Sequence, residues 1–267
     1  DRSPSRGLGD VYKRQIINGN SLPKVEKLID RLTAIEGMKS ISINQNTKKT
    51  NVILGDVTKC IWGDPYITDM IHLRDTKDFS LTDTAVAYHI SPQSFYQVNP
   101  VQTEKLYSLA LDYAGLTGKE KVIDAYCGTG TIGLIAASKA KEVIGVEIVE
   151  EAVTAAKENA EANGLTNCSF LAGDVLKVID EIEEKPDFIV LDPPREGIHP
   201  KALPKIVDLY RCEKMLYISC KPTSLARDLV EFAKYGYRVE KVCCVDMFPG
   251  TVHVETVSYT HLTLPTT

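Results

Sequence analysis

The chain has 267 residues, of which 43% are hydrophobic, 25% charged and only 7% aromatic. These values are ordinary for a folded protein, and they exclude a disordered chain, a collagen-like repeat and a small disulfide scaffold. The apolar runs are too short to cross a bilayer, so we expect no membrane partner. The formal net charge of -5 argues against a strongly basic nucleic-acid-binding surface, although a local basic patch is enough to bind phosphate.

The seven cysteines indicate an intracellular protein. Their number is odd, no C-x-x-C pair occurs and no signal peptide leads the chain, which predicts reduced thiols and a cytoplasmic location. Their spacing assembles no zinc site, so no metal ligands are predicted. We also expect the protein to be a monomer.

The two ends of the chain do not resemble parts of a fold. Residues 1–15 show no periodicity, and codons for Asp10–Gln15 have a reverse complement that encodes Val257–His261 in another frame. Ends that encode each other's complement resemble a translated sequencing-library adapter, so we expect 1–15 and 257–267 to be non-native tails. The chain between them is then expected to be a fragment of a longer protein, and residues 1–15 are expected to make few contacts.

Residues 16–85 are predicted to be part of a small α/β domain. Within 22–37 the apolar residues recur at helical spacing. Residues 40–44 and 50–54 alternate like two strands joined by a polar loop, and 59–90 continue as short strand-like pieces and turns.

From about residue 100 strands alternate strictly with helices. This alternation predicts a mostly parallel sheet covered by helices on both faces, with a ligand at the carboxyl ends of its strands. The expected strands are 121–126, 142–147, 168–171, 187–191, 214–219 and 238–245, and the expected helices are 131–139, 149–163, 175–184, 200–209 and 222–235.

A glycine loop, Asp124–Gly130, follows the first of these strands. Its glycines allow a tight turn and a close approach to a ligand. Gly128, Gly130 and Gly133 also spell G-x-G-x-x-G, so a dinucleotide competes as the cofactor. Asp124 favours S-adenosylmethionine, because a carboxylate suits an ammonium and a sulfonium and would repel a pyrophosphate.

Two more carboxylates follow the next two strands. Glu147 ends the second strand, where it can accept both hydroxyls of a ribose, whether of NAD or of S-adenosylmethionine. Asp174 follows the third strand and can meet an adenine amino group, cap the helix predicted over 175–184, or do both.

The fourth and fifth strand ends carry the residues suited to chemistry. Asp192-Pro193-Pro194-Arg195 follows the fourth strand, and its two prolines predict a rigid loop that presents Asp192 and Arg195. Cys220 follows the fifth strand. A cysteine there is by default a small buried hydrophobe, but we expect Lys221 and the start of a helix to lower its pKa and favour a nucleophilic thiolate.

The segment 248–256 predicts a turn that leads into a last strand. Alternation places His253 and Glu255 on one face of that strand. A Glu on a central strand is costly to bury without a function or a partner, whereas His253 fits a structural hydrogen bond. We expect strand 252–256 to lie inside the sheet, antiparallel to its neighbours, and to continue past Thr256 because Val, Tyr and Thr favour strands.

These motifs resemble the RNA uracil-C5 methyltransferase family, which modifies ribosomal RNA and the T-loop of tRNA. The resemblance covers 86–256 and implies a Rossmann-like α/β methyltransferase sheet over that range, mostly parallel with its last strand antiparallel. Five separated motifs carry it in order: Ser94–Pro100, Asp124–Gly130, Asp192–Arg195, Ser219-Cys220 with Leu225–Asp228, and Phe248–Glu255.

The resemblance also implies roles for single residues. Cys220 would be the nucleophile that adds to uracil C6, and Glu255 the acceptor of the C5 proton. The target base must leave its stack to reach them, and Phe95 and Tyr96 either stack on it or pack. Ribosomal RNA is expected rather than tRNA, from the spelling of the Tyr126-Cys127 loop. The residues expected to contact S-adenosylmethionine are Gln97, Tyr126, Glu147 and Asp192, with Asp124, Gly128 and Asp174 completing the cofactor site.

Departures from the family and rival interpretations stay open. Lys221 stands where the family commonly has Asn. Many members also carry an RNA-binding barrel and the ligands of an iron–sulfur cluster, and neither is visible in this sequence. We attribute this to truncation, and a longer protein could hold the iron–sulfur cluster. One alternative is an exocyclic-amine RNA or DNA methyltransferase, which would leave Cys220 and Glu255 idle. The others are an NAD-dependent oxidoreductase and a non-catalytic RNA-binding module.

Overall fold

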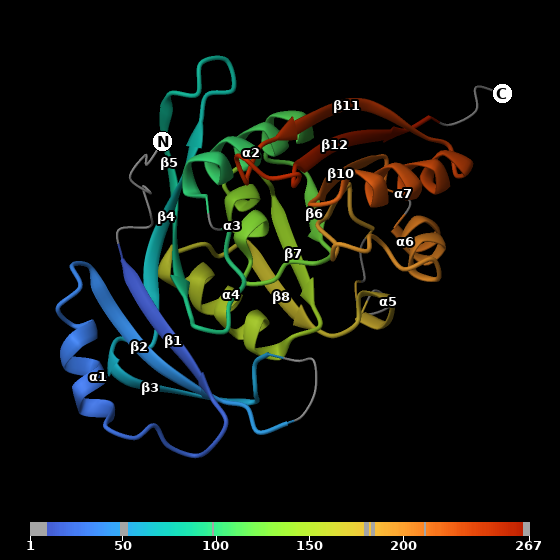
Figure 1. Cartoon of the computed structure of the whole chain (residues 1–267). Helices are drawn as coiled ribbons and strands as arrows, with labels where there is room; N and C mark the ends of the chain where they lie inside the picture. Colours follow the sequence, from blue (N-terminus) through green and yellow to red (C-terminus); the bar gives the residue numbers. More distant parts are fainter. Residues whose placement is uncertain are drawn as a thin grey trace. The chain divides into compact units, whose positions relative to one another are not determined.

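The protein folds into two compact units, shown in Figure 1. Unit 1 comprises Asp1–Met70 and Ala87–Val98, and unit 2 comprises Ile71–Val86 and Asn99–Thr267. The computed structural model describes residues 10–48, 53–97, 99–178, 182, 185–210 and 212–263.

Unit 1 contains a three-stranded sheet in the order β1-β2-β3. β1 (Val11–Ile17) pairs in parallel with β2 (Met38–Gln45), which pairs antiparallel with β3 (Val57–Gly63). Helix α1 (Val25–Leu32) connects β1 to β2, within the range predicted to be helical. The central strand β2 is the buried element, because all but two of its residues are shielded from solvent.

Two expectations for this unit are wrong. Val11–Gln15, expected to make few contacts, form most of β1, because their strand-favouring Val and Tyr residues pair with the open edge of β2. The strand expected over 50–54 falls partly outside the described residues, and Ile53 and Leu54 are not in a strand. The Asn44 side chain accepts a hydrogen bond from the Gly55 N–H at 2.7 Å and donates to its carbonyl at 2.8 Å, which holds this segment as a turn and delays the strand to β3.

Strands β4 (Ile67–Arg74) and β5 (Leu81–Ile90) form a two-stranded sheet and are longer than the short pieces predicted. The boundary predicted at residue 85 lies inside β5. Within unit 2, Glu104 anchors this hairpin: its carboxylate accepts hydrogen bonds from the backbone N–H of His72 at 3.1 Å and from Arg74 Nε at 2.7 Å.

The described part of unit 2 has a seven-stranded sheet in the order β11-β12-β10-β9-β6-β7-β8. Strands β6 to β10 are parallel, and β12 runs antiparallel to β10 and β11. This arrangement confirms the predicted α/β sheet and its antiparallel last strand, which extends past Thr256 as expected. The strands are β6 (Lys121–Asp124), β7 (Glu142–Glu147), β8 (Cys168–Ala172), β9 (Phe188–Leu191), β10 (Lys214–Ser219), β11 (Tyr237–Val245) and β12 (Glu255–Leu262).

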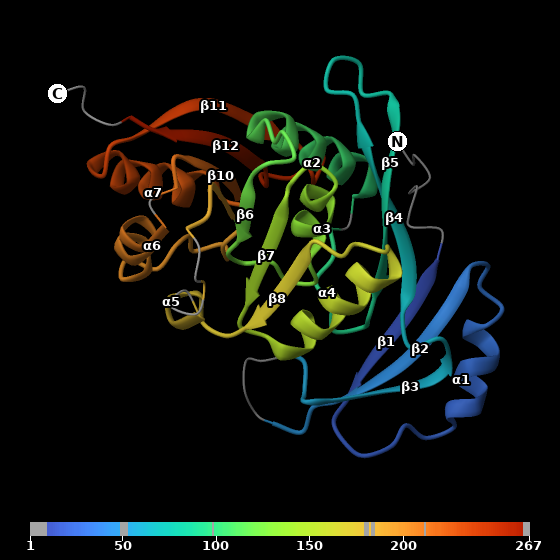
Figure 2. The ribbon, with the colours of Figure 1, turned by 180° about the vertical axis from the view of Figure 1, so that it is seen from behind.

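Helices cover both faces of this sheet, as Figures 1 and 2 show. α2, α3 and α4 pack in succession in one layer, and α5, α6 and α7 pack in succession in the other. Of the helix predicted over 175–184, the structure describes α5, while 179–181, 183 and 184 lie outside the described residues. In the described part of the chain no helix is long and apolar enough to cross a membrane. The helices are α2 (Pro100–Ala114), α3 (Thr131–Ala137), α4 (Glu150–Ala162), α5 (Val175–Val178), α6 (Ala202–Tyr210) and α7 (Pro222–Lys234).

Candidate active site

The carboxyl ends of β7, β6 and β9 bring predicted cofactor residues to one level of the sheet. β6 lies between β7 and β9, and its last residue, Asp124, pairs with Gly145 and Val190. The strand order reverses here, since β7 lies on one side of β6 and β9 on the other; such a switch point is where open α/β sheets bind ligands. Two residues beyond the paired positions come Tyr126, Glu147 and Asp192.

Two carboxylates hold the glycine loop between β6 and α3. The Gly128 N–H donates to Glu147 Oε2 at 3.1 Å, and the Gly133 N–H donates to Asp124 Oδ2 at 3.1 Å. Gly130 has a φ of 82°, and a Cβ at this position would lie 3.1 Å from the Ala156 Cβ. Glycine is therefore needed at Gly130 both for its backbone conformation and for the close approach of α4.

Asp124 is a fully buried carboxylate with one unused oxygen. Its Oδ1 atom has no hydrogen-bond partner among the described residues. Burial raises its pKa to about 7 and Glu147 adds to the rise, against the lowering effect of the N–H groups of Gly133 and Tyr126. A buried acceptor left without a donor costs about 1–3 kcal/mol. The loop therefore fits a ligand that brings a cationic donor, such as the ammonium of S-adenosylmethionine, together with a ribose for Glu147.

Asp174 lies beside Tyr126 at the same edge. Its backbone carbonyl accepts the N–H groups of Lys177 and Val178 in the first turn of α5. Burial raises the pKa of Tyr126 to about 12, and the charges of Asp174 and Asp228 contribute. Asp174 thus lies at the start of a helix, near enough to Tyr126 for its charge to raise the pKa of that residue.

The ladder between β10 and β12 leads to the two predicted catalytic residues. Its last pair is Ser219 with Thr256, so the next positions on the two strands are Cys220 and Glu255. Glu255 is 4% exposed, and Cys220 is half-buried. Burial raises the pKa of Glu255 to about 7, and Arg195 opposes that rise. The two side chains therefore come from strands that meet where the ladder opens.

The expectation that Lys221 and a helix start lower the pKa of Cys220 is wrong. Burial raises the pKa of the Cys220 thiol, the carboxylates of Glu255 and Asp192 raise it further, and Arg195 lowers it. Lys221 itself is exposed to solvent. The reason is that the fold buries the thiol and brings two carboxylates from other strand ends towards it, whereas the Lys221 side chain stays in solvent.

The Asp192–Arg195 loop connects the cofactor end of the site to Cys220. Burial raises the pKa of Asp192 well above its ordinary value, and Glu255 and Asp124 contribute to the rise. Arg195 Nη2 donates to His253 Nδ1 at 2.8 Å. His253 does not share a strand face with Glu255, because β12 begins only at Glu255; it lies in the preceding loop, with its ring edge-to-face against Phe248 at 6.3 Å.

The remaining predicted residues lie in unit 1. Gln97 is 8% exposed and Phe95 is 77% exposed. The Tyr96 hydroxyl donates to Asp69 Oδ2 at 2.8 Å, so Tyr96 is held by a hydrogen bond within this unit. The contact of Gln97 with the cofactor stays a prediction.

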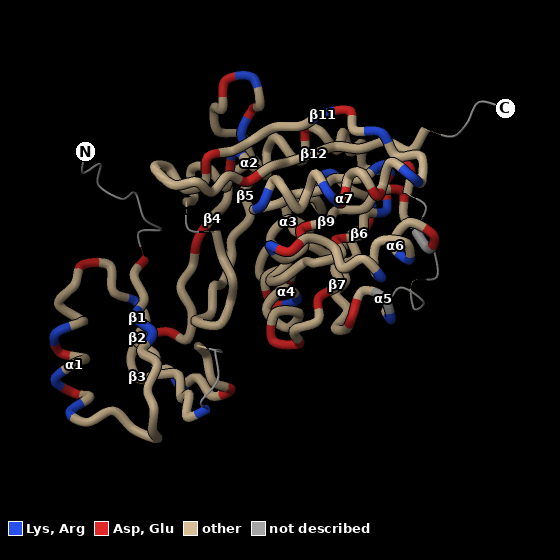
Figure 3. The backbone as a smooth tube through the Cα atoms, turned by 45° about the vertical axis from the view of Figure 1, so that its right-hand side comes forward, with Lys and Arg blue, Asp and Glu red and all other residues tan. Residues whose placement is uncertain are grey.

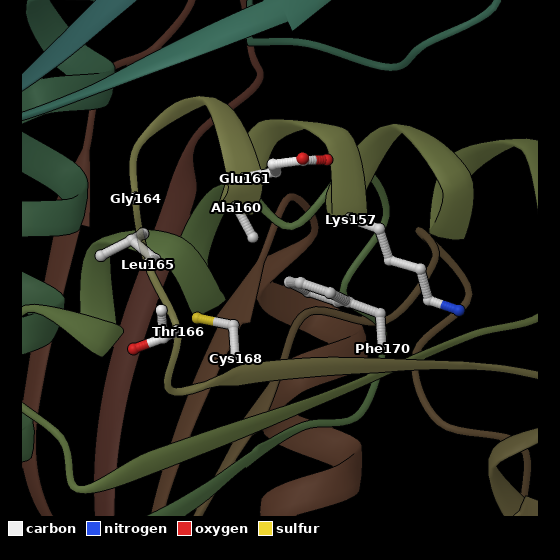
Figure 4. Close-up of a pocket in the computed structure, with 8 residues that line it drawn as sticks. All are labelled: Lys157, Ala160, Glu161, Gly164, Leu165, Thr166, Cys168 and Phe170. Carbon is white, nitrogen blue, oxygen red and sulfur yellow. The ribbon is translucent and has the colours of Figure 1, made fainter.

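An open surface pocket of about 320 Å³ lies away from these residues, between α4 and β8. Figure 4 shows Phe170 and Cys168 of β8 facing Ala160 of α4, with Lys157 beside them. Since none of the predicted site residues lines it, we place the functional site at the strand ends. Within the described ranges, no group of three or more His, Cys, Asp or Glu side chains could hold a metal ion.

Two family models each match about half of the chain. The model of a methyltransferase domain matches residues 116–249, and the model of protein-L-isoaspartate(D-aspartate) O-methyltransferases matches residues 48–182. Both matches include the glycine loop and Glu147. The chain therefore belongs to the methyltransferase-domain family, and its fold is that of S-adenosylmethionine-dependent methyltransferases.

Curated relatives with similar sequences are named as RNA methyltransferases. The chain is 45% identical over 261 residues to an uncharacterized RNA methyltransferase of Halalkalibacterium halodurans, covering 96% of this chain and 54% of that protein. It is 45% identical over 253 residues to one of Clostridium acetobutylicum, covering 93% of this chain and 52% of that protein. The chain thus spans about half the length of these relatives. Their names confirm the predicted resemblance to RNA methyltransferases.

Solved structures show the same likeness. The Pyrococcus abyssi tRNA (uracil-54, C5)-methyltransferase, in complex with S-adenosyl-L-homocysteine, matches with a TM-score of 0.71 and 29% identity, covering 94% of this chain and 56% of that chain. The M. jannaschii tRNA m1G37 methyltransferase matches with a TM-score of 0.56 and 13% identity, covering 96% of this chain and 74% of that chain. The second likeness concerns the fold alone.

Proposed function

We propose that this chain carries the catalytic part of an enzyme that transfers a methyl group from S-adenosylmethionine to C5 of a uridine in RNA. The observation that carries the proposal is the meeting of Cys220 and Glu255 at the open end of the β10–β12 ladder, beside Asp192 and Arg195. Methylation of an exocyclic amine needs no thiol, and neither does hydride transfer to NAD. Both alternatives leave this pair without a role.

The cofactor would bind along the strand ends. Glu147 would accept the ribose hydroxyls, Asp124 would face the ammonium, and Tyr126, Asp174 and Asp192 would line the space between them. Gly128 gives backbone access, and Gln97 is a further proposed contact. When bound, S-adenosylmethionine supplies an electrophilic methyl group.

Cys220 and Glu255 would perform the remaining steps. Uracil C5 is a poor nucleophile until a thiolate adds at C6. Cys220 forms the S–C6 bond, and the electron pair of the C5–C6 double bond moves into an enolate, which makes C5 nucleophilic. Once C5 carries the methyl group, Glu255 takes the C5 proton, the double bond re-forms and the C6–S bond breaks, which returns the thiolate. A pKa of about 7 suits Glu255 for this work at neutral pH.

Ribosomal RNA is the proposed substrate class, on the motif spelling of the Tyr126-Cys127 loop. The likeness to the tRNA (uracil-54, C5)-methyltransferase makes tRNA the second candidate. Figure 3 shows acidic and basic residues interspersed along α1 and over the helices of unit 2. With a net charge of -5, this chain alone should bind RNA weakly and with a strong dependence on salt.

The analysis of methylated nucleosides tests the proposal. The protein is incubated at low salt with isotope-labelled S-adenosylmethionine and transcripts of ribosomal RNA or tRNA. The RNA is then digested to nucleosides, and the labelled nucleosides are identified by mass spectrometry. We expect 5-methyluridine, which is lost in Cys220→Ala and kept in the control Cys244→Ala, because Cys244 is an exposed thiol. Label in N-methylated bases would instead establish the exocyclic-amine alternative.

A longer form of the protein should be more active. We propose that an upstream RNA-binding part supplies most of the affinity, so its restoration should raise turnover. Full activity of the 267-residue chain on a minimal RNA hairpin would show that such a part is dispensable.

A further inference from the structure

The carboxylate of Asp228 on α7 is buried and saturated with donors. The residue is 2% exposed. Its Oδ2 atom accepts the Tyr217 hydroxyl at 2.7 Å and the Ile198 N–H at 2.8 Å. Its Oδ1 atom accepts Nε and Nη2 of Arg227 at 2.9 and 2.7 Å. A buried carboxylate with four donors holds its neighbours in fixed places, because each lost bond leaves a buried polar group unpaired.

The same helix fastens the loop after β9 at consecutive positions. Ser224 Oγ donates to the Arg195 carbonyl at 2.9 Å, and Arg227 Nη2 donates to the Glu196 carbonyl at 2.7 Å. Gly197 follows with a φ of 81°, and a Cβ there would lie 2.4 Å from Asp228 Oδ2. The loop therefore lies directly against the carboxylate, and only glycine permits that approach.

The hydrogen bonds between α7 and the loop after β9 fix the position of Arg195 more than that of Asp192. Leu191 pairs with Tyr217 in the β9–β10 ladder, so the sheet itself fixes the neighbouring Asp192. Arg195 comes three residues later, in the part of the loop that α7 holds. Its cationic side chain lowers the pKa of both Cys220 and Glu255.

We propose that Asp228 is a positioning residue, which holds the loop of Arg195 and so keeps this cation, whose Nη2 donates to His253 Nδ1, near Cys220 and Glu255. The proposal rests on the proposed function only for the roles of Cys220 and Glu255 in methyl transfer. The placement of Arg195 against these two side chains can be tested without RNA.

The test is the pH dependence of Cys220 alkylation by iodoacetamide, followed for the Cys220 peptide by mass spectrometry. In Asp228→Asn the midpoint should rise by roughly half a pH unit or more, because an opposite charge near the thiol is displaced. Arg195→Gln should raise it similarly, and the double variant should show no further rise. The control Glu231→Gln lies on the same helix in an exposed ion pair with Lys234 and should leave the midpoint unchanged.

An unchanged midpoint in a folded Asp228→Asn protein would overturn the proposal, as would additive rises in the double variant. If Asp228→Asn does not fold, Tyr217→Phe removes a single donor from the same carboxylate. In Tyr217→Phe we expect a smaller rise in the midpoint of Cys220 alkylation, and the absence of a rise would also overturn the proposal. Absence of 5-methyluridine from treated RNA would defeat the proposed function alone, since the alkylation test contains no RNA.

Discussion

Replacement of Asp124 by Asn should change how the stability of the protein depends on pH. The folded pKa of about 7 lies above the ordinary value of 3.8. The folded protein therefore keeps a proton that the unfolded chain releases, so stability is fully present below about pH 4 and is lost as the pH rises towards 7. At about 1.36 kcal/mol per unit, the rise from 3.8 to about 7 corresponds to a loss of about 4 kcal/mol above pH 7.

Urea unfolding of both proteins at about pH 5 and pH 8 measures this effect. Between these two pH values the wild type should lose about 3 kcal/mol more than Asp124→Asn does. The Asn oxygen can still accept the Gly133 N–H, and the cost of its buried amide is the same at both pH values. Asp208→Asn on the exposed surface of α6 is the matched control. An identical pH dependence in Asp124→Asn and the wild type would show that burial does not raise the pKa of Asp124.

Three further outcomes are expected. Cys220→Ala should abolish covalent capture of RNA, measured as a shifted band on a denaturing gel, because the adduct bond is to its sulfur. Glu255→Gln should still form the adduct and transfer the methyl group but release product about 10²–10⁴-fold more slowly, so that a methylated adduct accumulates. If Glu255→Gln forms no adduct, Glu255 is not the base that removes the C5 proton. Gly145→Ala should lower the stability by about 1–3 kcal/mol, because its Cβ would lie 2.5 Å from Phe170 and 2.9 Å from Cys127 Sγ; thermal melting checks this, and an unchanged midpoint would contradict it.

The parallel sheet could be predicted from the sequence because its strands are short apolar runs that end in turn residues. The helix α2 was missed, although Leu106, Ala110 and Leu111 recur at helical spacing and Asn99 caps its start by accepting the Gln102 N–H. The other differences between the predicted and the observed elements arise from pairing between segments that are far apart in the sequence. The strand β1 exists because β2 offers an edge to it, and no local pattern reveals that partner.

The sequence predicts which residues form the site, but it does not predict how those residues affect one another's pKa values. In the sequence Cys220 stands next to Lys221, which predicts a lowered pKa. The fold instead buries the thiol and brings the charges of Glu255 and Asp192 towards it, so its pKa is raised. Asp228 was visible in a motif but had no apparent role. Its partner Ile198 lies 30 residues away along the chain, and only the fold joins the two.

The mass of the protein after incubation with S-adenosylmethionine and RNA that contains 5-fluorouracil tests directly whether Cys220 is the nucleophile. Fluorine at C5 leaves Glu255 no proton to remove, so the adduct cannot be resolved. After digestion with nuclease and protease, we expect the Cys220 peptide to carry one methylated fluorouridine nucleotide. An adduct on another cysteine, or methylated RNA without any adduct, would contradict this expectation.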